Sequence, residues 1–213
     1  MHKNSQKRFY EDGSIYFITS KALNNYPYFK ENILCDLFIE ELRLCKKLKG
    51  FELYAFCLNH DHFHLLIKPN EEFNISKIMK SFKENFSRDA NKIINNNAGE
   101  TSTSRLQYDY VSIDQSCLQG NNKLIDQCRI QELEFKKFDK IVNNLKSRFS
   151  EKHTNNHSFP KFQWQKSFHD HVIRNEKDFL EHLKYTEYNF QKHDFPKNWK
   201  YTSLNFLEII NKI

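Results

Sequence analysis

Two apolar runs separated by only three residues constrain the fold of this chain more than any other feature. Residues 51–58 (FELYAFCL) and 62–68 (HFHLLIK) are rich in the aromatic and branched side chains typical of strands. Only Asn59, His60 and Asp61 connect them, so the two runs are expected to form a β-hairpin. Both runs carry apolar residues on both faces, which predicts two central strands of a sheet that is covered on both sides.

The rest of the pattern arranges further strands and helices around this hairpin. Strands are predicted at 14–21 and 164–174, and helices at 30–48, 74–95 and 176–192. This order of elements matches an α+β fold, a ferredoxin-like sandwich in which helices pack on an antiparallel sheet of about four strands.

A change of composition at residues 95–104 (NNNAGETSTS) interrupts this order. Residues 97–160 are expected to be an insertion, partly helical and of unknown function, within a single domain at 10–205. A helix is predicted over 122–150, with apolar residues at Phe138, Ile141, Leu145 and Phe149.

Charge and cysteine content exclude some classes of protein but select none. The formal net charge of +6 is spread over all 213 residues, so it permits a polyanionic partner without identifying one. No apolar run is long enough to span a membrane, and the first residues lack an apolar signal region, so we expect a cytoplasmic protein with no membrane partner. The odd number of cysteines, without a CxxC pair, argues against a disulfide framework or a cysteine zinc site: Cys35, Cys45, Cys57, Cys117 and Cys128.

The pair His62 and His64 is the sharpest local feature of the hairpin. Alternation along a strand places both imidazoles on one face. They could supply two ligands of a divalent metal site, which needs at least one further ligand. The competing interpretation is a pair of partly buried, hydrogen-bonded structural histidines. A second pair, His169 and His171, lies on the late strand, and the residue pattern alone leaves open which pair, if either, binds a metal.

The predicted helix at 176–192 has two separate stripes. At about 100° per residue, the apolar stripe consists of Phe179, Leu183, Thr186 and Phe190. A polar stripe consists of His182, Tyr185, Asn189 and Lys192. A tyrosine can act as a covalent nucleophile and an amide oxygen can bind a metal ion, although Tyr185 at a helix edge can also be a surface residue without chemistry.

Taken together, these residues resemble the single-tyrosine HUH transposases with an IS200-like transposase domain, especially REP-associated tyrosine transposases. The resemblance covers about residues 10–96 and 161–205. It rests on the segments SIYFITSK, GFELYAFCLNHDHFHLLIKP, ISKIMKSFKENFSRDANK and WQKSFHDHVIRNEKDFLEHLKYTEYNFQKH, and on Trp199, Tyr201 and Ser203 near the end of the chain.

The resemblance implies a metal-dependent enzyme that cleaves and rejoins single-stranded or hairpin DNA. Tyr185 would form a 5′-phosphotyrosine, and His62, His64 and Asn189 would hold Mg²⁺ or Mn²⁺. His169 and His171 then become structural or DNA-proximal residues. Relatives include monomers and homodimers, and both remain open for this chain. The residues expected to contact DNA are Lys80, Lys83, Arg88, His171, Arg174 and Lys192.

Departures from the family pattern keep two other functions open. The family usually has Met-Pro-Asn before its histidine pair, where this chain has Asn59, His60 and Asp61, and Asn-Pro where this chain has Asn189 and Phe190. One alternative is a domesticated protein that binds hairpin DNA without cutting it. The other is a histidine-triad-type nucleotide hydrolase, because the row from His60 to His64 superficially resembles its alternating histidines.

Overall fold

The computed structural model describes residues 11, 13–94, 122–154, 159–193 and 195–212, with only the backbone for 122–129. Four strands form one antiparallel sheet in the order β2-β3-β1-β4. This is the predicted ferredoxin-like α+β arrangement, which is thereby confirmed. The strands are β1 (Tyr16–Lys21), β2 (Glu52–Leu58), β3 (His62–Lys68) and β4 (His169–Val172).

The predicted hairpin is formed by β2 and β3, and the backbone N–H of Asn59 closes its turn by donating to the carbonyl of His62 over 2.7 Å. β3 is a central strand as expected. The prediction for β2 was wrong, because β2 lies at the edge of the sheet. β2 is apolar on both faces because helices cover both faces of the sheet. The C-terminal segment covers its outer edge, where the backbone N–H of Leu58 donates to the carbonyl of Tyr201 over 3.0 Å.

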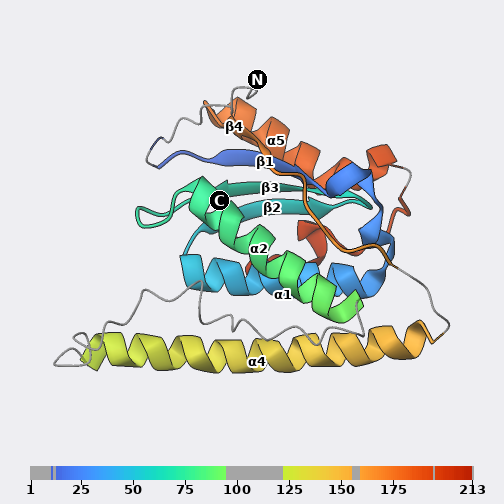
Figure 1. Cartoon of the computed structure of the whole chain (residues 1–213). Coiled ribbons are helices and arrows are strands. Elements are labelled where there is room, and N and C mark those ends of the chain that lie inside the picture. The colour runs from blue at the N-terminus through green and yellow to red at the C-terminus, as the bar shows by residue number, and fades with distance from the viewer. Residues whose placement is uncertain (1–10, 12, 95–121, 155–158, 194, 213) are drawn as a thin grey trace, which may run out of the picture.

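Helices cover the two faces of the sheet differently (Figure 1). α1 (Asn32–Lys49) and α2 (Ile75–Ile94) pack on one face and build the main core around Phe38, Phe63 and Phe82. α5 (Glu176–Tyr188) packs on the opposite face over a smaller core of Tyr54, Ala55, Leu66 and Phe179. The space between the sheet and α5 therefore holds those β3 side chains that point away from the main core.

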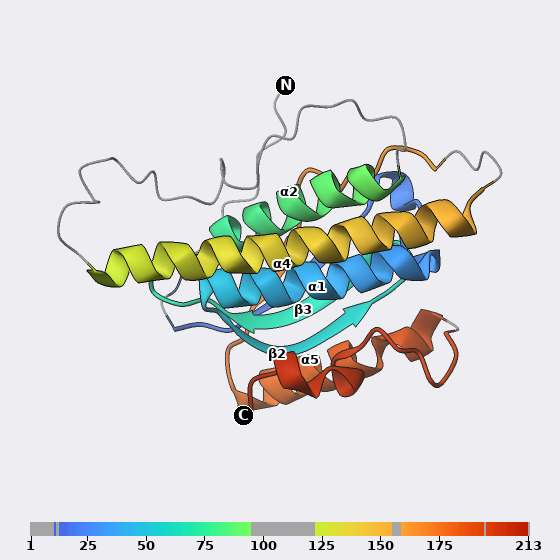
Figure 2. The same cartoon turned by 90° about the horizontal axis from the view of Figure 1, so that it is seen from below.

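The predicted helix of the insertion is α4 (Asn122–Lys152), which lies over α1 and α2 on their side away from the sheet (Figures 1 and 2). Phe138, Leu145 and Phe149 are buried in the main core, and Ile141 packs against it. The residues of the insertion before Asn122, Cys117 among them, and the side chain of Cys128 lie outside the described part. Cys35, Cys45 and Cys57 are buried thiols.

Two predicted elements are longer than the elements observed. Of the predicted strand at 164–174, only His169–Val172 belongs to the sheet, and Trp164 makes an isolated bridge to Ala22. The predicted helix at 176–192 stays α-helical to Tyr188 and continues as a 3-10 helix over Asn189–His193. No helix in the described residues has the length and apolar content that crossing a membrane requires.

Candidate active site

His62 and His64 lie on the face of β3 that α5 covers. Both are buried, with 6% and 5% of their surface exposed, and their ring centroids are 5.0 Å apart at an interplanar angle of 83°. Side chains alternate along a strand, so Phe63, which lies between the two histidines in sequence, points to the opposite face and into the main core. The predicted pairing of the two imidazoles on one face is therefore what the structure shows.

Asp61 fixes the orientation and tautomer of His62. Its carboxylate oxygen Oδ1 lies 2.6 Å from His62 Nδ1, and a carboxylate accepts, so Nδ1 carries the proton. The lone pair of His62 is then on Nε2, which accepts a hydrogen bond from the Asn59 amide nitrogen Nδ2 over 3.0 Å. Metal-binding histidines are commonly oriented by a carboxylate in this way.

Thr19 on β1 orients His64, because its hydroxyl oxygen lies 2.8 Å from His64 Nδ1. The other ring nitrogen, Nε2, is buried and has no hydrogen-bond partner among the described residues. Burial, followed by the repulsion that protonated forms of His62 and His193 would exert, lowers the pKa of His64 to about 3. The ring is therefore neutral near pH 7, which is the form that binds a metal ion.

The amide groups of Asn59 and Asn189 complete the buried part of the site. Asn189, at the start of the 3-10 helix after α5, is fully buried, and its Oδ1 accepts from Asn59 Nδ2 over 2.8 Å. A single NH₂ group thus faces both the lone pair of His62 Nε2 and the oxygen of Asn189. Together with the unpartnered His64 Nε2, these atoms are a donor set of two neutral nitrogens and one amide oxygen, which fits a divalent cation.

Tyr185 lies at the mouth of this buried group, one turn of helix before Asn189. Its ring meets that of His64 edge-on at 5.4 Å and that of Phe17 at 5.7 Å. Its surface is 37% exposed, and Lys192 Nζ lies 4.2 Å from its ring centroid. A phenol in this position is reachable by a large substrate and stands next to a positive charge.

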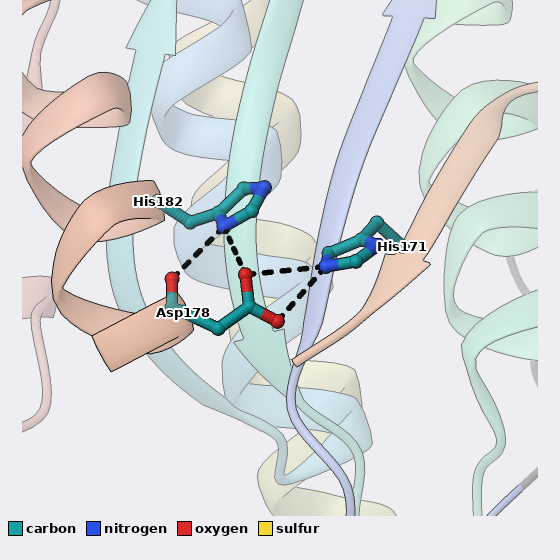
Figure 3. A group of neighbouring side chains, drawn as sticks. All are labelled: His171, Asp178 and His182. Carbon is teal, nitrogen blue, oxygen red and sulfur yellow. Dashed lines mark hydrogen bonds and ion pairs between the residues drawn. The ribbon is translucent and has the colours of Figure 1, made fainter. Parts of the chain in front are cut away.

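His171 does not join this group but takes part in a second one (Figure 3). Its ring stacks on that of His182 at 4.8 Å, and both contact the carboxylate of Asp178. Arg174 contributes its backbone N–H to the same carboxylate, while its side chain is exposed.

The three basic residues predicted on α2 lie across the sheet from His62 and His64. Lys80 is exposed, and Arg88 pairs with the neighbouring Asp89 over 3.2 Å. Lys83 Nζ donates to the backbone carbonyls of Gln165 and Ser167, which ties α2 to the segment that leads into β4. Lys192 is the residue of the predicted DNA-binding set that lies against the tyrosine.

Asn59, Asp61 and Thr19 are site residues that the sequence analysis did not predict as such. Asn59 and Asp61 were considered only as turn residues that depart from a family pattern. Thr19 could have been found only from the strand register, which places it opposite His64. His60, which the triad hydrolase would need, precedes β3, and its ring packs against that of Phe195 at 4.1 Å.

Comparisons with known proteins find similarity to transposases. Residues 19–117 match the family described as "Transposase IS200 like", a span that includes His62 and His64 and ends before α5. A "Putative REP-associated tyrosine transposase" of Haemophilus influenzae is 25% identical over 210 residues, 95% of this chain and 86% of that protein, so this similarity extends past Tyr185 and Asn189. A solved structure titled "Structure of the REP associates tyrosine transposase bound to a REP hairpin" covers 96% of this chain and 84% of its own, with 18% identity and a TM-score of 0.45.

Proposed function

We propose that this chain, which is similar to IS200-like and REP-associated tyrosine transposases, is a metal-dependent transposase that cleaves and rejoins single-stranded DNA through a 5′-phosphotyrosine. One observation carries the proposal. Tyr185 and Asn189, far from the histidine pair in sequence, meet that pair at a single place between β3 and α5. A nucleophile and a metal-ligand set are thereby combined in one site.

The ligands of the metal ion in this proposal are His62, His64 and Asn189. The bound Mg²⁺ or Mn²⁺ would act as a Lewis acid that polarises the scissile phosphate. The protein's own contribution is to hold the ligands ready: Asp61 and Thr19 each occupy the outward nitrogen of one histidine. Such outer contacts fix the ring orientation and raise the basicity of the ligand nitrogen.

Tyr185 is the proposed nucleophile. Its phenolic oxygen attacks the phosphorus, the bond from phosphorus to the 3′ oxygen breaks, and the departing strand leaves as a 3′-hydroxyl. The tyrosine retains the 5′-phosphate until a 3′-hydroxyl attacks it, reforms the phosphodiester and releases the phenol. The bond energy is conserved in the ester, so neither cleavage nor joining needs a nucleotide cofactor.

DNA is the substrate that the surroundings of Tyr185 favour. The ammonium group of Lys192 lies beside the phenol, and the exposed Arg174 is at the end of β4 that leads into α5. Positive charges of this kind bind backbone phosphates and make the affinity salt-dependent. We propose a hairpin as the form of DNA that is recognised, because the resemblance of the sequence to REP-associated tyrosine transposases implies it.

A single assay tests the proposal. The protein is incubated with end-labelled hairpin DNA and Mn²⁺, and covalent adducts are separated on a denaturing gel. The wild type is expected to form an adduct, whereas Tyr185→Phe binds the DNA and forms none. Tyr188→Phe is the matched control, since Tyr188 is also exposed near the end of α5, and its adduct should equal that of the wild type.

Other results would contradict the proposal in different ways. An undiminished adduct in Tyr185→Phe would remove the nucleophile assignment. A wild-type protein that shifts the hairpin on a native gel but never cuts it would be a binding protein without cleavage. A protein that binds no DNA and hydrolyses nucleotides in a His60-dependent way would belong to the triad-type alternative.

A further inference from the structure

A second group of potential metal ligands lies between β4 and the first turns of α5 (Figure 3). His171 comes from β4, while Asp178 and His182 are one turn apart on α5. One nitrogen or oxygen atom from each of the three lies within 4.8 Å of the others. The side chains are partly buried, with 36%, 18% and 24% of their surface exposed, so the group is accessible from solvent.

Two of the three distances between these atoms are close to those of a tetrahedral site. Asp178 Oδ1 lies 2.9 Å from His182 Nδ1 and 3.3 Å from His171 Nε2. Ligands about 2.0–2.1 Å from a tetrahedral ion are about 3.3 Å from one another. Both rings turn a nitrogen toward the carboxylate, and His182 Nδ1 also donates to the backbone carbonyl of Asp178 over 2.9 Å. These nitrogens donate in the metal-free group, so binding an ion requires each ring to carry its proton on the other nitrogen.

The carboxylate at the centre of the group is held in place by the backbone. The N–H of Arg174 donates to Asp178 Oδ2 over 3.0 Å, and Asn175 caps the helix through the N–H of Asp178. The Arg174 hydrogen bond, followed by that of His171, lowers the pKa of Asp178 below its usual value. Asp178 is therefore an oriented, ionised ligand.

The group is separate from the His62 and His64 site. β1 lies between β3 and β4, and Phe17 on β1 stands between the two sets of imidazoles. The Phe17 ring stacks on His64 at 5.3 Å and contacts His182 at 4.8 Å. An ion bound by one set is thus shielded from the other by an aromatic ring.

We propose that His171, Asp178 and His182 form a second metal site, which binds a transition-metal ion such as Zn²⁺ or Co²⁺. Two imidazoles and one carboxylate are ligands that favour these ions over Mg²⁺, and a three-residue set leaves a fourth position open to water. The ion ties α5 to β4 one turn before Tyr185. The proposal is independent of the function of Tyr185, because it rests only on these three side chains.

The test uses the full-length His64→Ala variant, which lacks a ligand of the first proposed site, so that the second group is measured alone. Co²⁺ and Zn²⁺ binding is followed by titration calorimetry, and the Co²⁺ absorption spectrum reports nitrogen and oxygen ligands. We expect one ion per chain, and at least a tenfold loss of affinity when His171→Gln or Asp178→Asn is added. His169→Gln is the matched control, since His169 is an exposed histidine on the same strand outside the group, and it should leave affinity unchanged.

Two outcomes would overturn the proposal. One is the absence of Co²⁺ and Zn²⁺ binding in His64→Ala protein whose circular dichroism spectrum shows that it is folded. The other is equal affinity in the His171→Gln, Asp178→Asn and His169→Gln proteins. Neither outcome would contradict the proposed DNA cleavage, which the covalent adduct assay measures separately with Mn²⁺.

Discussion

At the scale of single residues, Asn59 has the most informative position in the molecule. Its buried amide nitrogen donates to His62 Nε2 and to Asn189 Oδ1, two of the three atoms proposed to bind the metal ion. The partly positive hydrogens of this amide and a metal cation would bind the same lone pairs on these two atoms. Asn59 therefore stabilises the ligand set without a metal and competes with the metal for it.

Replacing this side chain separates the two effects. In EDTA, Asn59→Ala leaves two buried acceptors without a donor and is expected to lower the free energy of unfolding by about 1–3 kcal/mol. In saturating Mn²⁺ the deficit should shrink, and calorimetry should show tighter Mn²⁺ binding than in the wild type. Urea unfolding in both buffers measures this, with the exposed Asn205→Ala as control. Weaker Mn²⁺ binding in Asn59→Ala would show that the amide helps to hold the ion.

Thr19 offers a second test at this scale. Thr19→Val keeps the shape of the side chain but removes the oxygen that contacts His64 Nδ1. Losing such an outer contact typically costs about 10–100-fold in metal affinity, and we expect a loss in this range for Mn²⁺. Ser20→Ala is the neighbouring control on the other face of β1, and it should leave Mn²⁺ affinity as in the wild type. Equal affinities in the two variants would contradict the ligand role of His64.

The sequence allowed the faces on which the proposed site residues lie to be predicted, but not the hydrogen-bond partners of these residues. Alternation on β3 and helical spacing in α5 are local, so they predicted which face each of His62, His64 and Tyr185 occupies. The partners depend on how separate segments meet. Thr19 reaches His64 only in the observed register of β1 and β3, and Asn59 reaches Asn189 only once the C-terminal 3-10 helix has packed on the hairpin.

At the scale of elements, a buried carboxylate joins the insertion to the main fold. Glu31 precedes α1 and caps it by accepting from the N–H of Ile33 over 3.1 Å. Lys152, the last residue of α4, and the following His153 contact the same carboxylate at 2.9 Å and 2.8 Å. Burial alone would raise the pKa of Glu31, but the hydrogen bonds from Lys152, Ile33 and His153 lower it below its ordinary value of 4.5.

The direction of this shift predicts how stability depends on pH. A carboxyl group with a lower pKa in the folded state stabilises the fold fully above its unfolded value of 4.5 and loses that contribution as the pH falls through its folded pKa. Glu31→Gln should therefore cost about 1–3 kcal/mol at pH 7 and progressively less below pH 4.5. Urea unfolding from pH 3 to 7 tests this, and an equal cost at both ends would contradict it. Glu132→Gln, whose pair with Lys136 is exposed, is the control.

The lengths of elements were predicted less well than their existence, for physical reasons. Residues 164–174 were predicted as one strand. Instead, Trp164 packs against Phe86 and Phe162 of the main core, and Lys83 binds backbone carbonyls that follow Trp164. Only the residues after that point pair along β1. The stripe on 176–192 is helical throughout, but a tighter 3-10 turn after Tyr188 brings Asn189 under the hairpin.

At the scale of the whole molecule, α5 and the insertion helix α4 lie on opposite sides of the sheet (Figure 1). Tyr185 and both histidine groups are on the α5 side, whereas α4 covers α1 and α2. α4 therefore leaves the site on α5 open in a single chain. Its buried aromatic and aliphatic side chains belong to the same core as those of α1 and α2, so we propose that the insertion is part of one cooperative domain rather than an appendage.

Two leucines on α4 test whether that core is shared. Leu145 is buried against the main core, and Leu133 on the same helix is 57% exposed, so Leu→Ala is the same chemical change in two environments. Leu145→Ala should lower the free energy of unfolding by about 2–5 kcal/mol and shift the whole transition, because it leaves a cavity among residues of the three helices. Leu133→Ala should change it by less than about 0.5 kcal/mol. Urea unfolding followed by both circular dichroism and tryptophan fluorescence measures each variant. A Leu145→Ala protein in which helix content falls in a separate early step, while the tryptophan transition stays at the wild-type midpoint, would show that α4 unfolds alone.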